Sequence, residues 1–229
     1  LLHTTSNRNS VQLHWARRLA MCLDAARGMC FLHGEGIIHR DLKSANLLVD
    51  RSYRVKVCDF GLAQTLSTVV GGSRREVGTP QYDAPEVIVD GKPADVYSDV
   101  YSYGVVLWEV ALRRRPFGEL SERVGQGAMF CAITENYRSG VGLPMEDWPT
   151  ADASGPDGGG AVALVGDDLR QLVTSCLILK PTRKQPRPTF EAIAAAIGEM
   201  LQKMRHRANM ERREAERSSG GGGTLQTPR

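Results

Sequence analysis

The sequence predicts a mainly α-helical domain that contains one small β-hairpin region. Stretches with apolar residues at helical spacing outnumber every other pattern in the chain. Two short apolar runs, around 47–49 and 55–58, are separated by the turn-like residues 50–52 and predict a hairpin. The chain has 229 residues, of which 41% are hydrophobic and 24% are charged, which suffices for one domain with a sizeable core.

The first half of the chain predicts one helix, the hairpin and a long loop. The helix covers 11–32, with Ser10 as its N-cap and Gly34 and Gly36 after its end. Residues 62–77 are polar and have no period, so they predict a long loop. The apolar residues of the helix recur at spacings of three and four and form one buried stripe: Trp15, Leu19, Cys22, Ala26 and Met29.

The second half predicts four more helices and an insertion. A helix over 98–112 is apolar nearly all round, which indicates a central, buried position, and Pro116 is expected to stop it. A shorter helix is predicted over 127–134, and residues 138–166 are rich in Gly, Pro, Asp and Ser, which predicts a flexible surface insertion. Asp168 is the expected N-cap of the next helix, and Thr189 is the expected start of the last one.

The composition predicts three segments along the chain. Residues 1–202 form the globular domain, residues 203–217 a polar, mildly basic helical extension, and residues 218–229 a low-complexity, disordered tail. The net charge of +3 is too small to indicate a nucleic acid or a membrane surface as a partner.

The lack of a recognisable targeting signal and the pattern of cysteines lead us to expect a cytoplasmic protein. The longest apolar run, 104–112, is interrupted by Glu109 and is far shorter than the roughly 20 residues of a membrane span. The N-terminus does not resemble a signal peptide. The five cysteines are scattered, which fits small core residues in a reducing compartment. The sequence contains no Cys-x-x-Cys pair, so we do not expect structural zinc.

Two polar clusters flank the predicted hairpin. Asp41, Lys43 and Asn46 lie within six residues before it, and Asp59 lies directly after it. The hairpin would hold the two clusters side by side, so that two carboxylates, an amide and an ammonium group converge. This set suits a polyphosphate with Mg²⁺, which prefers hard oxygen ligands and few carboxylates. The alternative for Asp41, a loop aspartate that caps nearby amides, explains this residue alone but not the convergence.

These residues resemble the signature motifs of eukaryotic protein kinases. His39-Arg40-Asp41-Leu42-Lys43-Ser44-Ala45-Asn46 resembles the catalytic loop, and Asp59-Phe60-Gly61 resembles the magnesium-binding motif. Ala84-Pro85-Glu86, residues 98–104 and Arg187-Pro188 follow in family order. The resemblance covers residues 1–202 and looks closest to the tyrosine-kinase-like group of serine/threonine kinases, which includes Raf-like and mixed-lineage kinases. It implies the large, C-terminal lobe of the kinase fold.

The resemblance implies an ATP- and Mg²⁺-dependent phosphoryl transfer to Ser or Thr of protein substrates. Lys43 and Thr79 are similar to the serine/threonine pattern rather than to the tyrosine pattern. The implied site comprises Asp41, which accepts the proton of the substrate hydroxyl; Lys43, which contacts the transferring phosphate; Asn46 and Asp59, which hold Mg²⁺; Gly61, where a Cβ would obstruct the turn; and Thr79, which bridges Asp41 and Lys43.

Further matching residues imply support and regulation. Glu86 and Arg187 match a buried ion pair, and Asp99 matches a buried aspartate that binds the catalytic-loop backbone. His39 is expected to be a packed support, and neither His33 nor His39 is expected to bind metal. Arg40 matches an arginine that pairs with a phosphorylated loop residue, which implies an upstream activating kinase. The candidate phosphate acceptors are Thr65, Ser67, Thr68 and Ser73.

The pattern departs from the family at its start. The glycine-rich phosphate loop, strand lysine and helix glutamate of the small lobe belong before Leu1, so we expect the small N-terminal lobe to be absent from this chain. The chain alone is therefore expected to bind ATP poorly. Two functions stay open: a piece of an active kinase, favoured by the intact polar cluster, and a non-catalytic, kinase-like interaction module.

Overall fold

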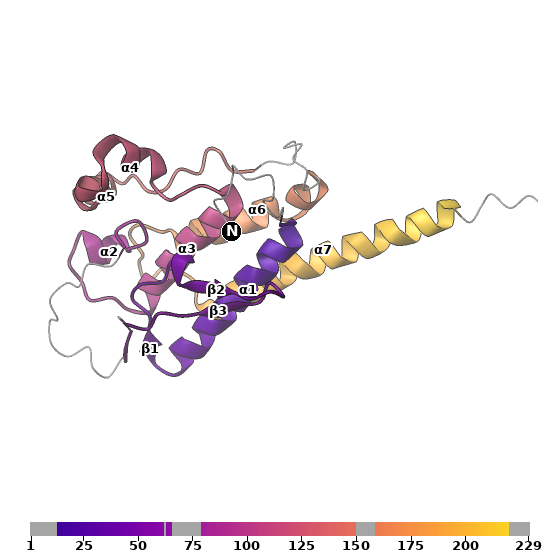
Figure 1. The fold of residues 1–229 in the computed structure, drawn as a ribbon, viewed down its shortest axis with the longest axis horizontal. Coiled ribbons are helices and arrows are strands. Elements are labelled where there is room, and N and C mark those ends of the chain that lie inside the picture. Colours follow the sequence, from indigo (N-terminus) through magenta and orange to yellow (C-terminus); the bar gives the residue numbers. More distant parts are fainter. Residues whose placement is uncertain (1–12, 62, 66–78, 150–158, 220–229) are drawn as a thin grey trace, which may run out of the picture.

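The computed structural model describes residues 13–61, 63–65, 79–149 and 159–219. Helices dominate these residues, and two small antiparallel sheets of two strands each lie beside them (Figure 1). The predicted class, mainly α with a small hairpin region, is confirmed. In the part of the chain that the structure describes, no helix is both long enough and apolar enough to cross a membrane.

The elements follow one another from the first helix to a long last one, which projects from the body (Figure 1). The helices are α1 (Trp15–Gly34), α2 (Pro85–Ile88), α3 (Val96–Leu112), α4 (Gly118–Val124), α5 (Met129–Arg138), α6 (Gly159–Cys176) and α7 (Phe190–Ser219). The strands are β1 (Ile37–Ile38), β2 (Leu47–Val49), β3 (Val55–Val57) and β4 (Gln64–Thr65), and 3₁₀ turns cover Ser44–Asn46 and Gln126–Ala128.

Helix α3 is the centre of the core, as its apolar sequence predicts. Fourteen of its 17 residues are buried. It begins at Val96, before the expected Ser98, because the Asp95 carboxylate accepts hydrogen bonds from two backbone N–H groups of the first turn. It ends at Leu112, as predicted, because Arg113 adopts a left-handed conformation with φ 54°.

Helix α1 packs against α7 and buries the predicted stripe. All five stripe residues are at most 5% exposed, and Ile193 and Ile197 of α7 are fully buried. The helix runs from Trp15 to Gly34 rather than over 11–32, and its N-cap is His14 rather than Ser10. Apolar spacing does not mark the first turn of this helix, which begins four residues later than the sequence predicts.

The hairpin of β2 and β3 pairs in the predicted antiparallel manner. Asp50 closes its turn, because its Oδ1 accepts hydrogen bonds from Ser52 N and Arg54 N at 2.8 and 2.9 Å. Asp24 of α1 fixes the hairpin from below: its carboxylate accepts from Val55 N at 3.2 Å and pairs with Arg54 at 3.1 Å. The helix and the hairpin therefore form one rigid support.

Several sequence expectations need correction in the first two thirds of the chain. Residues 64–65 form β4, which pairs with β1, so the predicted loop 62–77 contains a short strand. Its other residues, except 63, lie outside the described ranges. Helix α4 was not expected, and α5 covers Met129–Arg138 rather than 127–134. The predicted insertion 138–166 is partly packed, because Trp148 is 5% exposed and its Nε1 donates to Gly166 O at 3.0 Å.

The last two helices also differ from expectation. Helix α6 begins at Gly159, so Asp168 is not its N-cap but lies inside it and accepts a hydrogen bond from Lys203 Nζ at 2.6 Å. Thr189 directly precedes α7, and its Oγ1 accepts from Ala192 N at 3.3 Å. Helix α7 continues through 203–217 to Ser219, so the first two residues of the expected disordered tail are helical. Residues 220–229 lie outside the described ranges.

The cysteines are all free thiols. Cys22 and Cys176 are buried in the core, and desolvation raises the pKa of each thiol to about 12. Cys131 is exposed, so the expectation of a core position is wrong for this residue, which lies on the outer face of the amphipathic α5.

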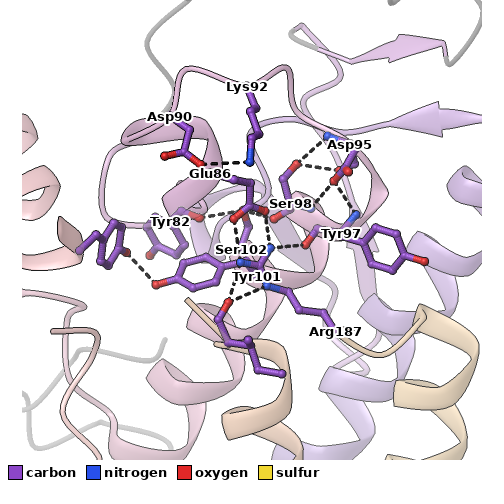
Figure 2. Close-up of polar contacts among 12 residues, drawn as sticks. Tyr82, Glu86, Asp90, Lys92, Asp95, Tyr97, Ser98, Tyr101, Ser102 and Arg187 are labelled. Atoms are coloured by element: carbon purple, nitrogen blue, oxygen red, sulfur yellow. Dashed lines mark hydrogen bonds and ion pairs between the residues drawn. The ribbon is translucent and has the colours of Figure 1, made fainter. Parts of the chain in front are cut away.

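A buried ion pair ties α2 to the segment before α7 (Figure 2). Arg187 is 1% exposed, and its two Nη atoms donate to the two Glu86 carboxylate oxygens at 2.5 and 2.9 Å. The same guanidinium donates to the backbone oxygens of Tyr97 and Ile178 and lies 4.9 Å from the centre of the Tyr101 ring. Every donor of this buried cation has a partner, which offsets its desolvation.

Substituting Gly104 tests the close approach of α3 to α6. An added Cβ would lie 2.7 Å from Cys176 Cβ, so Gly104→Ala should lower the free energy of unfolding by about 1–3 kcal/mol in urea denaturation. Gly198→Ala in α7 is the matched control, because a Cβ added at Gly198 would have no neighbouring atom within 4 Å. This substitution should raise the free energy of unfolding by up to about 1 kcal/mol. Equal effects of the two substitutions would contradict the packing described.

Removing one partner tests the Glu86–Arg187 pair. Glu86→Ala should lower the free energy of unfolding by about 3–5 kcal/mol, because Arg187 is then buried without a counter-charge. The matched control is Asp168→Ala, which breaks a surface pair whose side chains are 39% and 52% exposed and should cost no more than about 1 kcal/mol. A similar loss in both variants would show that the burial of Arg187 does not matter.

Candidate active site

The loop at residues 39–46 joins β1 to β2 and is held by the buried Asp99 of α3. Asp99 Oδ2 accepts a hydrogen bond from His39 N at 2.8 Å, and Oδ1 accepts from Arg40 N at 2.9 Å. Arg40 has a φ of 69°, a left-handed conformation that costs a residue with a Cβ about 1–3 kcal/mol. Asp99 therefore stabilises a strained backbone directly before Asp41.

Asp41, Lys43 and Thr79 form a closed triangle of hydrogen bonds. Lys43 Nζ donates to Asp41 Oδ2 at 2.7 Å and to Thr79 Oγ1 at 2.8 Å. Thr79 Oγ1 in turn donates to Asp41 Oδ1 at 3.1 Å. The Asp41 and Lys43 side chains are 12% and 23% exposed, so the triangle is anchored yet reachable from solvent. Thr79 lies in the bridging position that the sequence resemblance implies.

Asn46 is attached to Asp41 and leaves one oxygen available. It is 4% exposed, and its Nδ2 donates to Asp41 O at 2.8 Å and to Asp41 Oδ2 at 3.2 Å. These two bonds fix the amide so that its oxygen is the remaining acceptor.

A backbone hydrogen bond brings Asp59 close to Asn46. Cys58 N donates to Asn46 O at 3.0 Å, so Asp59 directly follows the residue that pairs with Asn46. One amide oxygen, from the 3₁₀ turn before β2, and one exposed carboxylate, from the segment after β3, fit Mg²⁺, which takes few protein ligands and completes its shell with water and phosphate. No group of three or more His, Cys, Asp or Glu residues suited to a metal occurs in the described ranges.

The expected steric role of Gly61 is not seen. A Cβ at Gly61 would lie 3.4 Å from Asp59 Oδ1, which is close to ordinary contact. The left-handed residue of this segment is instead Asp59, with a φ of 65°. Gly61 N donates to Asp59 Oδ1 at 3.4 Å, so the backbone after the aspartate orients its carboxylate.

His39 connects the two polar segments and is packed between them. It is fully buried, its Nδ1 accepts from Asp41 N at 3.3 Å, and its Nε2 donates to Cys58 O at 3.1 Å. The imidazole ring also lies 5.6 Å from the Phe60 ring. Both ring nitrogens are thus occupied by backbone groups on either side of the site.

A polar chain that sequence reasoning did not assign supports the loop from α3. Tyr82 OH donates to Glu109 Oε2 at 2.8 Å and lies 3.2 Å from Ser44 Oγ. Burial, together with the Glu109 charge, raises the pKa of Tyr82. Glu109 is 1% exposed, and its interruption of an otherwise apolar run was the available sequence signal.

The expected phosphate acceptors are only partly covered by the described residues. The backbone of Thr65 lies in β4, opposite Ile37. Ser67, Thr68 and Ser73 lie outside the described ranges.

Comparison with known proteins matches the chain to one family and to several relatives. The family described as "Protein kinase domain" matches residues 2–197. The "Serine/threonine-protein kinase CTR1" of Arabidopsis thaliana is 50% identical over 123 residues, which cover 53% of this chain and 15% of the relative. The "Probable serine/threonine-protein kinase SIS8" of the same plant is 47% identical over 131 residues, 56% of this chain and 12% of the relative.

A third relative covers more of the chain. The "Dual specificity protein kinase shkD" of Dictyostelium discoideum is 35% identical over 202 residues, 88% of this chain and 23% of the relative. The chain therefore spans less than a quarter of the length of each of these relatives. Because the family match covers most of the chain and includes the triangle of Asp41, Lys43 and Thr79, this chain belongs to the protein kinase domain family, as its motifs predict.

Proposed function

We propose that this chain is the catalytic lobe of a protein kinase that transfers the γ-phosphoryl group of ATP to Ser or Thr of protein substrates. The closed triangle of Asp41, Lys43 and Thr79 carries this proposal. Protein kinases as a family use ATP and Mg²⁺. A module without chemistry has no physical need for an ammonium group and a hydroxyl that together fix both oxygens of one carboxylate.

Asp41 is proposed to orient the substrate hydroxyl and to accept its proton. Its Oδ2 accepts hydrogen bonds from Lys43 and Asn46, whereas its Oδ1 accepts one, from Thr79, and keeps a lone pair for the substrate hydroxyl. Because Lys43 and Thr79 fix both oxygens, the substrate hydroxyl meets an acceptor whose direction is already set, which lowers the entropic part of the barrier.

Lys43, Asn46 and Asp59 are proposed to act on the phosphate side. The Lys43 ammonium is fixed by two oxygen acceptors and can donate its third N–H to a phosphate oxygen. The Asn46 amide oxygen and the Asp59 carboxylate would hold Mg²⁺, which neutralises charge on the phosphate oxygens when it is bound.

The substrate class is proposed as Ser/Thr, with Tyr as the competing class. Lys43 and Thr79 form a hydrogen-bonded pair beside Asp41, which is the arrangement that the serine/threonine pattern implies. Two of the relatives named above are described as serine/threonine kinases, and the third as a dual-specificity kinase. Phosphoamino-acid analysis of the product separates these outcomes.

Regulation and location are further proposals. Phosphorylation at Thr65, Ser67, Thr68 or Ser73 by an upstream kinase would supply a negative charge for Arg40, which lies next to Asp41. The five free thiols favour the reducing cytoplasm.

A non-catalytic interaction module is the second candidate. Leu48 and Phe60, next to the proposed magnesium ligands, are 59% and 49% exposed, which is unusual for large apolar side chains beside a polar site. An active kinase would cover this surface with nucleotide and a second lobe, whereas a module would cover it with a partner protein.

Replacing Asp41 tests the proposed function. In the full gene product, Asp41→Asn should lower kcat for phosphorylation of a Ser/Thr protein substrate by at least about 100-fold, because the amide cannot accept the proton. The control Asp147→Asn changes a surface carboxylate that is 62% exposed and should leave kcat unchanged. An inactive wild-type protein that nevertheless binds a partner would favour the interaction module.

Replacing Thr79 tests the bridge. Thr79→Val keeps the shape but removes the hydroxyl that joins Asp41 to Lys43, so kcat should fall about tenfold or more while the KM for ATP changes little. Thr79→Ser retains the hydroxyl and should keep most of the activity. If valine and serine gave the same kcat, the bridge would have no part in the reaction.

A further inference from the structure

The end of α7 projects from the body of the protein and lies beyond the matched kinase domain (Figure 1). The family match ends at residue 197, and Leu201 is the last buried residue of the helix. Every residue of 205–217, called the projecting segment below, is exposed. Packing within the described part of the chain therefore does not account for the sequence of this segment.

Three arginines of the projecting segment have no carboxylate partner among the described residues: Arg205, Arg213 and Arg217. The helix dipole favours a cation in the last turn, which accounts for Arg217 but not for the other two. The remaining arginines use two of the three glutamates, with N···O distances of 2.6 and 2.9 Å in the ion pairs Arg207–Glu211 and Arg212–Glu216.

The three unpaired arginines lie on one face of the helix. Arg205 and Arg213 are eight residues apart and Arg213 and Arg217 are four apart, so they share an arc of roughly 120°. Like charges four residues apart destabilise a helix that has no other support. Met210 is 42% exposed and lies at the edge of the same face. This basic face therefore lowers the stability of the free helix, and a partner that supplies carboxylates would reverse the effect.

The residue types of the basic face favour a protein partner. Arginine and methionine are enriched in protein–protein interfaces, and a guanidinium group binds a carboxylate through two parallel hydrogen bonds. A helix that lies on a membrane needs a broad apolar face, whereas Met210 is the only large apolar residue of the projecting segment. The interspersed glutamates would repel the phosphates of a nucleic acid: Glu211, Glu214 and Glu216.

We propose that the projecting segment is a docking helix for an acidic helix of a partner protein. Carboxylates of the partner pair with Arg205, Arg213 and Arg217, and an apolar residue of the partner covers Met210. Acidic residues four and eight positions apart on the partner helix match the spacing of the arginines, because both helices rise by about 1.5 Å per residue. This role does not depend on phosphoryl transfer, since the segment lies outside the family match.

The test titrates the full chain into a fluorescent, alanine-rich helical peptide that has Glu at every fourth position and one central Leu. Glutamine replaces the arginines because its helix propensity is similar. The docking variant combines Arg205→Gln, Arg213→Gln and Arg217→Gln. The matched control removes the same number of charges from cations of α7 that already have partners: Lys203→Gln, Arg207→Gln and Arg212→Gln.

The Kd of the peptide should rise about tenfold or more in the docking variant and stay within about twofold of wild type in the matched control. Met210→Gln keeps every charge and should raise the Kd about threefold, because the apolar contact is lost. Amide hydrogen exchange in 205–217 should slow when the peptide binds, since the free segment has no packing to protect it.

Four results would overturn the proposal. The first is the absence of peptide binding to the wild-type chain at low salt, and the second is an equal rise of Kd in the docking variant and the matched control. The third is tighter binding of single-stranded RNA or of phosphatidylserine vesicles than of the peptide. The fourth is a wild-type dimer in sedimentation that the docking variant abolishes, because the partner would then be a second copy of this chain.

Discussion

The structure depends on the pair of hydrogen bonds that the Asp99 carboxylate accepts from His39 N and Arg40 N. Arg40 is held with a φ of 69°, and the loop that follows carries Asp41, Lys43 and Asn46. Strained backbone persists only where its surroundings over-determine it. Here the restraint is a buried charge on the central helix, so the geometry of the site is set by the core rather than by the loop.

Helix α3 supports the site at three levels. Asp99 in its first turn holds the loop; Tyr101 packs on the Arg187 guanidinium; and Glu109, two turns further on, accepts from Tyr82. These side chains explain why a helix that reads as almost wholly apolar still contains buried polar residues. Each buried carboxylate has a hydrogen-bonded donor, which offsets the cost of removing it from water.

The sequence anticipated the parts of the fold that follow from local pattern. The buried stripe of α1 and the hairpin of β2 and β3 follow from spacing and turn residues, and the kinase motifs indicated Asp41, Lys43, Asn46 and Asp59 together. The missed features depend on tertiary contact. His33 forms a hydrogen bond with a residue 66 positions away in the sequence, and Asp24 with one 31 positions away. No local sequence pattern predicts contacts between residues so far apart.

Local sequence also predicted helix ends and backbone conformation poorly. Asp168 has the chemistry of an N-cap but lies inside α6, where Lys203 of α7 pairs with it. Glycine tolerates unusual backbone, which favours a steric role for Gly61, yet the left-handed residue is Asp59. In both cases residue type indicated a possible role, and packing decided which residue filled it.

The central claim is that Asn46 and Asp59 hold Mg²⁺ beside a carboxylate fixed by Lys43 and Thr79. A crystal structure of the full gene product with Mg²⁺ and a non-hydrolysable ATP analogue tests it most directly. We expect a magnesium ion about 2.1 Å from Asn46 Oδ1 and from an Asp59 carboxylate oxygen, with the Asp41 triangle unchanged. A nucleotide bound elsewhere, or a metal ion that does not touch Asn46 and Asp59, would contradict the account.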